Sequence, residues 1–600
     1  MFGKPHVYLD KTAAPRFRTA KTEALLYYLS VTGRSYSREA LADLLWSDMP
    51  ETKAKRNLTQ ILYHLRKSFE PFLIIEAQSI GFNQAADHWI DVAAFEKAAV
   101  YGLLEGDVEG LSKAIELYRG DLLEGFYVKN SLLFEEWLQG QRERLRELMA
   151  QALQFLVDYY INSDASDITK GIAYARRLLA LDPWRETAHR QMMLLLARSG
   201  QLDKALIQYQ ACRRILADEL GIGPSTETAV LHERIQLART MPPQHLPVLT
   251  TPFVGREAEL AQLTRLLTST DCRLATLVGL GGNGKTALAL ETTRRFQQER
   301  AFQFLNGITF VSFTSTTSIA RLPPTLAETL NLPLSGRTDP LTAILDYLRN
   351  KEMLLVLDGF EHLLDGIDFI TAILNTCPNV KILVTSRAPL YLEAEYRLDV
   401  EGLNYPRNGA QNLADYDAVQ LFVQMAQRVN PQFELSAETQ TALAQICRIV
   451  AGMPLAIKLA AAWLRVMPIQ RVVTEVQHNL DFLSTDMRDI PPRQRSIRAV
   501  FDSTWEVLKP DEQCAFQALS VFHESFSAEA AAAVACASPY LLANLIDKSL
   551  VQVEHAGRDT RYQLHELLRQ YAISRLRTHQ PLAPHIQAQS SWRRASYARH

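Results

Sequence analysis

A glycine-rich segment near the middle of the chain has the residue types and spacing needed to hold a polyphosphate. It reads GLGGNGKT over residues 279–286 and fits the pattern G-x-x-x-x-G-K-[ST] in full. The glycines let backbone N–H groups close on phosphate oxygens, the Lys285 ammonium can neutralise β- and γ-phosphate charge, and the Thr286 hydroxyl can bind Mg²⁺. An apolar run at 274–278 precedes the loop and the helix-forming run ALALE follows it. The expected nucleotide-binding residues are Gly279, Gly281, Gly282, Asn283, Gly284, Lys285 and Thr286.

A second apolar run supplies the carboxylate that such a loop requires. In MLLVLDGFEHL (353–363), five apolar residues lead to Asp358. We expect Asp358 and Thr286 to hold the Mg²⁺ ion together. Glu361 could position an attacking water, or it could be an ordinary solvated glutamate at the start of a helix. The sequence leaves both alternatives open.

An arginine closes a further strand-like run, VKILVTSR (380–387). The side chain of Arg387 could reach a γ-phosphate and sense its loss, so Asp358, Glu361 and Arg387 form the candidate catalytic set. No N-K-x-D guanine-reading signature is present, since NKEM (350–353) lacks the acid. Adenine is therefore the favoured base, and ATP or ADP with Mg²⁺ is the expected cofactor.

The runs around these residues indicate how they are positioned. LATLVGL, GITFVSF, EMLLVLDGF and VKILVTSR are β-rich and alternate with helical patterns. This alternation predicts a doubly wound parallel sheet within a multidomain chain of the α+β and α/β classes. With 600 residues, 47% hydrophobic and 22% charged, the chain has the composition of several globular domains.

Charge and cysteine usage exclude other classes of protein. The net charge of −2 provides no global field for nucleic acid, so such contact needs a local patch. Six scattered cysteines without a C-x-x-C pair favour reduced thiols. No signal peptide opens the chain and no uncharged apolar run reaches the ~20 residues that span a bilayer, so we expect a cytoplasmic protein without membrane contact.

The pattern along the chain predicts seven segments. A proline-rich, uncharged stretch separates a mostly helical first half from the nucleotide-binding half. The predicted segments are a winged helix-turn-helix (1–97), a tetratricopeptide-like helical domain with a period of about 34 residues (98–239), a linker (240–252), a P-loop NTPase domain (253–410), a helical module (411–490), a second winged-helix module (491–578) and a tail without repeats (579–600).

The third predicted helix, residues 50–70, carries a basic face in a chain that is otherwise near neutral. At 100° per residue its leucines share one face, and basic, amide and aromatic side chains occupy the other. Cations for phosphates and Arg, Asn or Gln for base edges suit a recognition helix. The alternative is an ordinary solvated basic face. The candidate DNA-binding residues are Lys53, Arg56, Asn57, Gln60, Tyr63, His64 and Lys67.

Six motifs in order resemble those of the NB-ARC or STAND class of nucleotide switches. Besides the three runs above they are FVGREAEL (253–260), GMPLAIKLAA (452–461) and YQLHELLRQYA (562–572). The resemblance implies that Arg256 approaches the nucleotide, that Gly452 and Pro454 pack near adenine, and that His565 touches the phosphates of bound ADP. The family motif continues His-Asp, whereas in this chain Glu566 follows His565.

The first half resembles SARP-type (antibiotic regulatory) transcriptional activators. KTEALLYYLS, SREALADLLW, RNLTQILYHLRKSF and IDVAAFEKA are similar to their DNA-binding domain, and the segment from LYRGDLLEGF to about residue 235 is similar to their bacterial transcriptional activator domain. This resemblance implies promoter DNA and RNA polymerase as partners.

The two resemblances together predict a regulator in which nucleotide state gates homo-oligomerisation and promoter activation. Hydrolysis, if present, would be a slow reset, and the inducer is not visible in the sequence. Two alternatives remain open. One is a P-loop ATPase or kinase that turns over a substrate, and the other is an ATPase signalling scaffold that binds only protein partners.

Overall fold

The computed structural model describes residues 1–578 except 10–11, 15–16, 163–166, 241–245, 250, 300–302, 315, 317, 333–338, 408–411, 486–493 and 557–558. The predicted tail and part of the predicted linker therefore lie outside the described residues. The chain forms two compact units, Met1–Glu233 and Arg234–His600. The division falls within helix α10 (Thr226–Thr240), a few residues before the proline-rich stretch.

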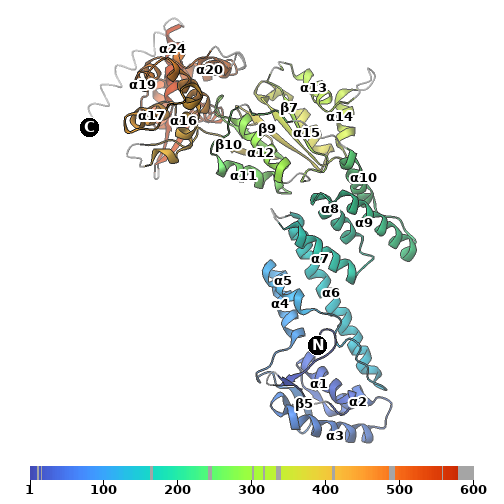
Figure 1. Ribbon diagram of the computed structural model, residues 1–600. Helices are drawn as coiled ribbons and strands as arrows, with labels where there is room; N and C mark the ends of the chain where they lie inside the picture. The colour runs from blue at the N-terminus through green and yellow to red at the C-terminus, as the bar shows by residue number, and fades with distance from the viewer. Residues whose placement is uncertain are drawn as a thin grey trace. The chain divides into compact units, whose positions relative to one another are not determined.

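Three helices and a small antiparallel sheet, whose strand β3 lies between the first two helices, form the start of the first unit, drawn in blue in Figure 1. Ser37 ends a short strand and caps the second helix, because its hydroxyl accepts from the Ala40 N–H at 3.1 Å. The sheet has the order β3-β5-β4. The elements are β1 (Tyr8–Leu9), β2 (Thr12–Ala13), α1 (Ala20–Thr32), β3 (Tyr36–Ser37), α2 (Arg38–Trp46), α3 (Glu51–Phe69), β4 (Leu73–Ile75) and β5 (Ser79–Phe82).

The rest of the first unit is helical. Its apolar core is continuous with that of the opening helices, since Leu25 and Leu45 belong to the same buried cluster as Leu138 and Leu153. The helices are α4 (Asp91–Glu105), α5 (Val108–Leu117), α6 (Leu132–Asn162), α7 (Ile168–Leu181), α8 (Glu186–Arg198), α9 (Leu202–Ile215) and α10.

The second unit begins with a five-stranded parallel sheet covered by helices on both faces. Its order is β10-β6-β9-β8-β7, and every neighbouring pair is parallel. The predicted parallel sheet is confirmed. The strands are β6 (Leu274–Val278), β7 (Ile308–Ser312), β8 (Met353–Asp358), β9 (Val380–Ser386) and β10 (Glu395–Asp399).

Alternation along a strand divides the core of this sheet in two. Leu355 and Leu357 of β8 pack in one cluster, whereas Leu354 and Val356 pack in another. Both sets are apolar because a sheet covered on both faces buries successive side chains in opposite directions. The helices of the first cluster are α13 (Leu322–Thr329), α14 (Pro340–Leu348) and α15 (Ile367–Thr376), and those of the second are α11 (Glu257–Thr268) and α12 (Lys285–Glu299).

The remainder of the second unit is mostly helical and shares one large core. The helices are α16 (Asp417–Val429), α17 (Ala437–Ile449), α18 (Pro454–Ala462), α19 (Ile469–His478), α20 (Ile497–Trp505), α21 (Pro510–Leu519), α22 (Ala528–Ala535), α23 (Pro539–Asp547) and α24 (Glu566–Thr578). A hairpin of β11 (Gln552–Ala556) and β12 (Asp559–Gln563) precedes α24.

Within the described ranges, no single helix is long and apolar enough to cross a bilayer; only the bent pair α22 and α23 meets the length and composition test. The same residues contain no cluster of three or more histidine, cysteine, aspartate or glutamate side chains arranged to hold a metal.

Candidate nucleotide and nucleic-acid sites

The glycine-rich loop joins β6 to α12, as the sequence predicts. Gly282 and Gly284 have φ values of +86° and +88°, which explains why side chains other than glycine would be strained there. Lys285 is the first residue of α12 and is 9% exposed. Its Nζ donates to the carbonyls of Gly279 at 2.7 Å and Leu280 at 3.0 Å. Burial lowers the pKa of Lys285 to about 8, because the buried site disfavours the charged form of its ammonium group.

Asp358 ends β8 directly beside this loop. Its Oδ1 accepts hydrogen bonds from Thr286 Oγ1 at 2.6 Å and from Thr385 Oγ1 at 2.7 Å. Burial raises the pKa of the Asp358 carboxyl, and these two hydrogen bonds oppose that effect. The paired oxygens of Thr286 and Asp358 provide the hard donors that Mg²⁺ prefers.

A cavity of about 360 Å³ opens over the loop. Its lining combines polar side chains, among them Lys285, Thr286 and Arg387, with a larger set of apolar ones. Ligand pockets commonly span ~300–1,000 Å³ and combine an apolar wall with a few placed polar groups. The apolar wall comprises Leu249, Pro252, Phe253, Val254, Leu403, Leu421, Pro454 and Leu455.

Arg387 lines the cavity and contacts both Glu361 and helix α20. Its Nε is 3.2 Å from Glu361 Oε1, and both side chains are 12% exposed. Its Nη1 donates to Val500 O at 3.1 Å and to Thr504 Oγ1 at 2.6 Å, both on α20. Of the two alternatives for Glu361, a solvated surface residue does not agree with this burial. The arginine thus joins the cavity to a distant helix of the same unit.

Helix α20 also packs directly on the loop. A Cβ placed on Gly281 would lie 2.5 Å from Val500 Cγ1, so only glycine permits this approach. The N-terminus of α18 contacts the loop as well, because Leu455 N donates to Gly282 O at 3.2 Å. Two C-terminal helices therefore touch the phosphate-binding loop.

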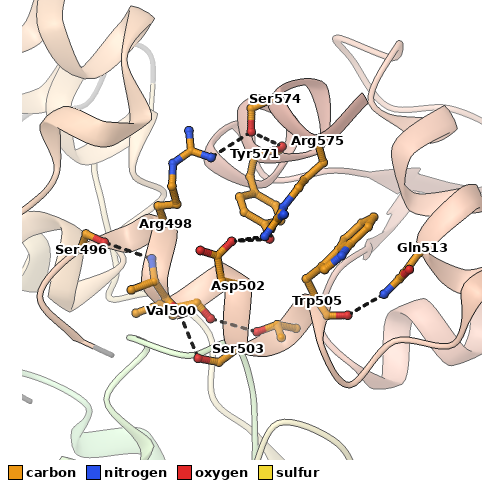
Figure 2. Close-up of polar contacts among 12 residues, drawn as sticks. Ser496, Arg498, Val500, Asp502, Ser503, Trp505, Gln513, Tyr571, Ser574 and Arg575 are labelled. Carbon is orange, nitrogen blue, oxygen red and sulfur yellow. Dashed lines mark hydrogen bonds and ion pairs between the residues drawn. The ribbon is translucent and has the colours of Figure 1, made fainter. Parts of the chain in front are cut away.

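The far side of α20 is bound to α24, as Figure 2 shows. Asp502 Oδ1 accepts from Tyr571 Oη at 2.7 Å and from Arg575 Nη2 at 2.6 Å. The Arg575 guanidinium also lies 5.6 Å from the Trp505 ring centroid. Movement of α20 would have to disturb contacts on both of its sides.

Arg256 stabilises the glycine-rich loop through hydrogen bonds to backbone carbonyls. It is 6% exposed, and its Nη2 donates to the carbonyls of Asn283 at 2.8 Å and Glu401 at 2.6 Å. Burial lowers its pKa. Asn283 Nδ2 donates to Val400 O at 2.9 Å, so its side chain points into the protein. Arg256 lines the cavity, whereas Asn283 and Gly279 are not among the lining residues.

The structure does not bring His565 into the cavity lining. His565 Nδ1 accepts from Leu567 N at 3.0 Å, and Nε2 lies 3.1 Å from Val450 O. These two contacts fit a neutral ring protonated at Nε2, and burial lowers the pKa of His565. Val450 lies just before Gly452 (φ +68°) and Pro454, which does line the cavity. The His565 ring thus contacts the backbone two residues before the Gly452 turn, and its expected contact with the phosphates of ADP stays a prediction.

Several residues of the cavity were not among those predicted. Thr385 bonds to Asp358, Lys458 Nζ donates to Thr251 Oγ1 at 2.9 Å, and Val500 covers the loop. Thr385 and Lys458 lie inside the motifs VTSR and GMPLAIKLAA, so these motifs could have identified them as cavity residues. Val500 and Thr504 have no local signal, because only tertiary packing brings α20 here.

The basic face of α3 is exposed. Leu58, Leu62, Leu65 and Phe69 are buried, as the periodicity predicts. Among the candidate DNA-binding residues, Lys53, Arg56, Gln60, Tyr63 and Lys67 are exposed, and Asn57 and His64 are half-buried. The Lys67 Nζ lies 4.9 Å from the Tyr63 ring centroid.

Two protein families match the chain. The bacterial transcriptional activator domain matches residues 90–236, and the NB-ARC domain matches residues 256–391. A Mycobacterium tuberculosis protein named as an HTH-type transcriptional regulator, Rv0890c, is 33% identical over 51% of this chain and 34% of its own length. An uncharacterized protein of the same organism, Rv0894, is 30% identical over 54% of this chain and 81% of its own length. The regulatory protein AfsR of Streptomyces coelicolor is 27% identical over 94% of this chain.

The chain spans about a third of the length of the HTH-type relative and 57% of AfsR. The two domain matches follow one another in the order of the two resemblances, and the AfsR match includes both. The chain therefore combines a bacterial transcriptional activator domain with an NB-ARC domain, and it is similar to the regulatory protein AfsR over a stretch that contains both.

Proposed function

We propose that this chain is a DNA-binding transcriptional activator whose nucleotide state, ATP or ADP, gates oligomerisation and promoter activation. The observation that carries the proposal is the double contact of Arg387. This arginine lines the cavity beside Lys285 and also donates to Thr504 on α20. A group shared between a ligand site and a packed helix gives the ligand a route to alter that helix.

The nucleotide would lie with its phosphates on the glycine-rich loop and its base against apolar residues of the cavity. Lys285 and Arg256 would face or support the phosphates, and Pro454 would pack on the base. Thr286 and Asp358 would hold Mg²⁺, which neutralises phosphate charge when bound. The short contact between their side-chain oxygens, 2.6 Å, supports a shared ligand role.

The burial of Lys285 supports a site that distinguishes ATP from ADP rather than one that binds both nucleotides equally. A desolvated ammonium gains most from an anion with high charge, so the γ-phosphate is worth more here than in water. A ligand that shifts a two-state equilibrium from 1:99 to 99:1 needs about 5.5 kcal/mol of differential affinity. Lys285, Mg²⁺ and Arg387 together are a plausible source of that difference, with Glu361 holding Arg387 in place. Any hydrolysis would serve as a slow reset.

In this proposal each predicted segment has a separate role. Residues 1–97 would form a winged helix-turn-helix with α3 as recognition helix, and 98–239 a tetratricopeptide-like activator domain that contacts RNA polymerase. Residues 253–410, 411–490 and 491–578 would form the NTPase, helical and second winged-helix modules of the switch. The exposure of Arg56, Gln60 and Lys67 supports a DNA-reading role for α3. Promoter DNA, further copies of the chain and an inducer would be the partners.

The test measures promoter binding and transcription in defined nucleotide states. The full chain is loaded with ADP or a non-hydrolysable ATP analogue, then assayed on DNA from directly upstream of its gene. Mass and transcript yield are measured in parallel. We expect assembly and transcription with the ATP analogue only. Equal output in both states would refute the gating, and no affinity for DNA at low salt would favour the signalling scaffold.

A further inference from the structure

A groove of about 610 Å³ runs beside α3 in the first unit. The α3 side is formed by Asn57, Gln60, Ile61 and His64. The opposite side combines the start of α1 with residues 127–129, which follow α5 and lie beyond the first predicted segment. The remaining lining residues are Arg18, Thr19, Ala20, Lys21, Thr22, Trp46, Tyr127, Val128 and Lys129.

The groove is cationic. Arg18, Lys21 and Lys129 line it, and no aspartate or glutamate does. Among the described residues none of these three cations forms an ion pair; burial lowers the pKa of Lys21, and the nearby Asp48 carboxylate opposes that effect only in part. Three positive charges without a lining acid, in a chain of net charge −2, favour an anionic ligand.

Lys21 connects the start of α1 with the end of α2 and with the segment that carries Lys129. Its Nζ donates to Leu45 O at 2.5 Å and to Asn130 O at 3.0 Å, and it lies 5.1 Å from the Trp46 ring centroid. Ser131 Oγ donates to the same Leu45 carbonyl at 2.8 Å. The segment that carries Lys129 is therefore fixed against the end of α2.

Arg18 and Lys129 keep their charged groups at the surface. Both residues are exposed, and Arg18 Nη1 lies 3.4 Å from His64 Nε2 on α3. Gln60 belongs to the groove and also to the exposed face of α3. The cationic groove and the proposed base-reading face are thus one continuous surface.

We propose that this groove binds the sugar-phosphate backbone of the DNA strand that flanks the α3 contact, with Arg18 and Lys129 as phosphate ligands. This inference rests on the proposed DNA-binding function. Backbone contacts fix the register of a protein on a duplex, while base edges supply sequence information. Because Lys129 lies outside 1–97, the activator segment completes the DNA-binding surface rather than only following it.

The test is the salt dependence of DNA binding by the full chain. The probes are a duplex of about 40 bp from directly upstream of the gene and a random-sequence duplex of equal length. Each neutralised phosphate contributes about −0.9 to the slope of log K against log salt. Arg18→Ala and Lys129→Ala should each reduce the slope by about 0.9, and the double variant by about 1.8. At 0.15 M salt each variant should bind both duplexes about fivefold more weakly.

Lys97→Ala is the matched control, because Lys97 is exposed on α4 and lies outside the groove. It should retain the wild-type slope, as should Arg18→Lys, which keeps the charge. Unchanged melting temperatures show that the variants are folded.

Three outcomes would overturn the proposal. An unchanged slope in the double variant, with wild-type protein bound to DNA, would remove the groove from the DNA contact while leaving the proposed function intact. Lost transcription with an unchanged slope would assign the groove to a phosphorylated peptide or a free nucleotide. No wild-type affinity for either duplex at 50 mM salt would instead refute the DNA-binding function itself.

Discussion

Arg387 Nη1 donates a hydrogen bond to Thr504 Oγ1 across 2.6 Å, although the two residues are 117 positions apart. The same guanidinium faces the cavity over the glycine-rich loop. A γ-phosphate that recruits Arg387 must therefore compete with α20 for it. This competition can be measured, because the Thr504 hydroxyl can be removed without changing the volume of the side chain.

Thr504→Val removes the hydroxyl and keeps the side-chain volume. A hydrogen bond to a charged group contributes about 1.5–3 kcal/mol, so we expect ATP affinity to rise about tenfold or more while ADP affinity stays unchanged. Fluorescent-nucleotide titration measures both constants. Thr504→Ser, which keeps the hydroxyl, serves as control. An unchanged ratio of ATP to ADP affinity would show that α20 does not compete for Arg387.

Lys285→Ala should weaken ATP binding by about 10- to 150-fold, since a charge-assisted contact worth about 1.5–3 kcal/mol is lost. Promoter binding by the first unit should remain, because Lys285 belongs to the second. Calorimetry with ATP and a DNA-binding assay separate the two effects. Lys509→Ala provides an exposed-lysine control. Loss of both activities in Lys285→Ala would contradict the proposed division of labour.

Arg56→Ala should reduce discrimination between the upstream duplex and a random duplex, because an arginine bound to a base edge contributes about 1–3 kcal/mol of specificity. ATP affinity should not change. Competition titrations with both duplexes measure this effect. The exposed Arg119 on the same unit offers the control substitution. Equal weakening on both duplexes would make Arg56 a phosphate contact instead.

His565 makes stability depend on pH in a defined direction. Because burial holds its folded pKa below the unfolded value near 6.5, the unfolded chain binds an extra proton between these two values. The contribution of His565 to stability is complete above about pH 6.5 and is lost as pH falls toward the folded pKa, at no more than about 1.4 kcal/mol per pH unit.

His565→Gln removes this titration and keeps a neutral donor toward Val450 O. Denaturant unfolding of both proteins at pH 5.5 and 7.5 measures the difference. The variant should lose less stability on acidification than the wild type. Equal losses would mean that other groups carry the pH dependence.

Sequence periodicity and local motifs predicted the parallel sheet, the loop around Lys285 and the carboxylate Asp358, because each depends on neighbouring residues. The buried face of α3 followed from its 3.6-residue repeat. The partners of Arg387 could not be predicted, since Thr504 reaches it only through packing between distant segments. The motif around His565 could not predict the contacts of its ring either, because they depend on where Val450 lies in the folded chain.

Gly281 leaves room for Val500 because it lacks a Cβ, and its backbone does not have a positive φ. Alanine is therefore compatible with the backbone of the turn, but its Cβ would lie 2.5 Å from Val500 Cγ1 on α20 and 3.4 Å from the Arg387 guanidinium. Every glycine codon becomes an alanine codon through one base substitution. A single base substitution would therefore place a methyl group between the phosphate-binding loop and α20.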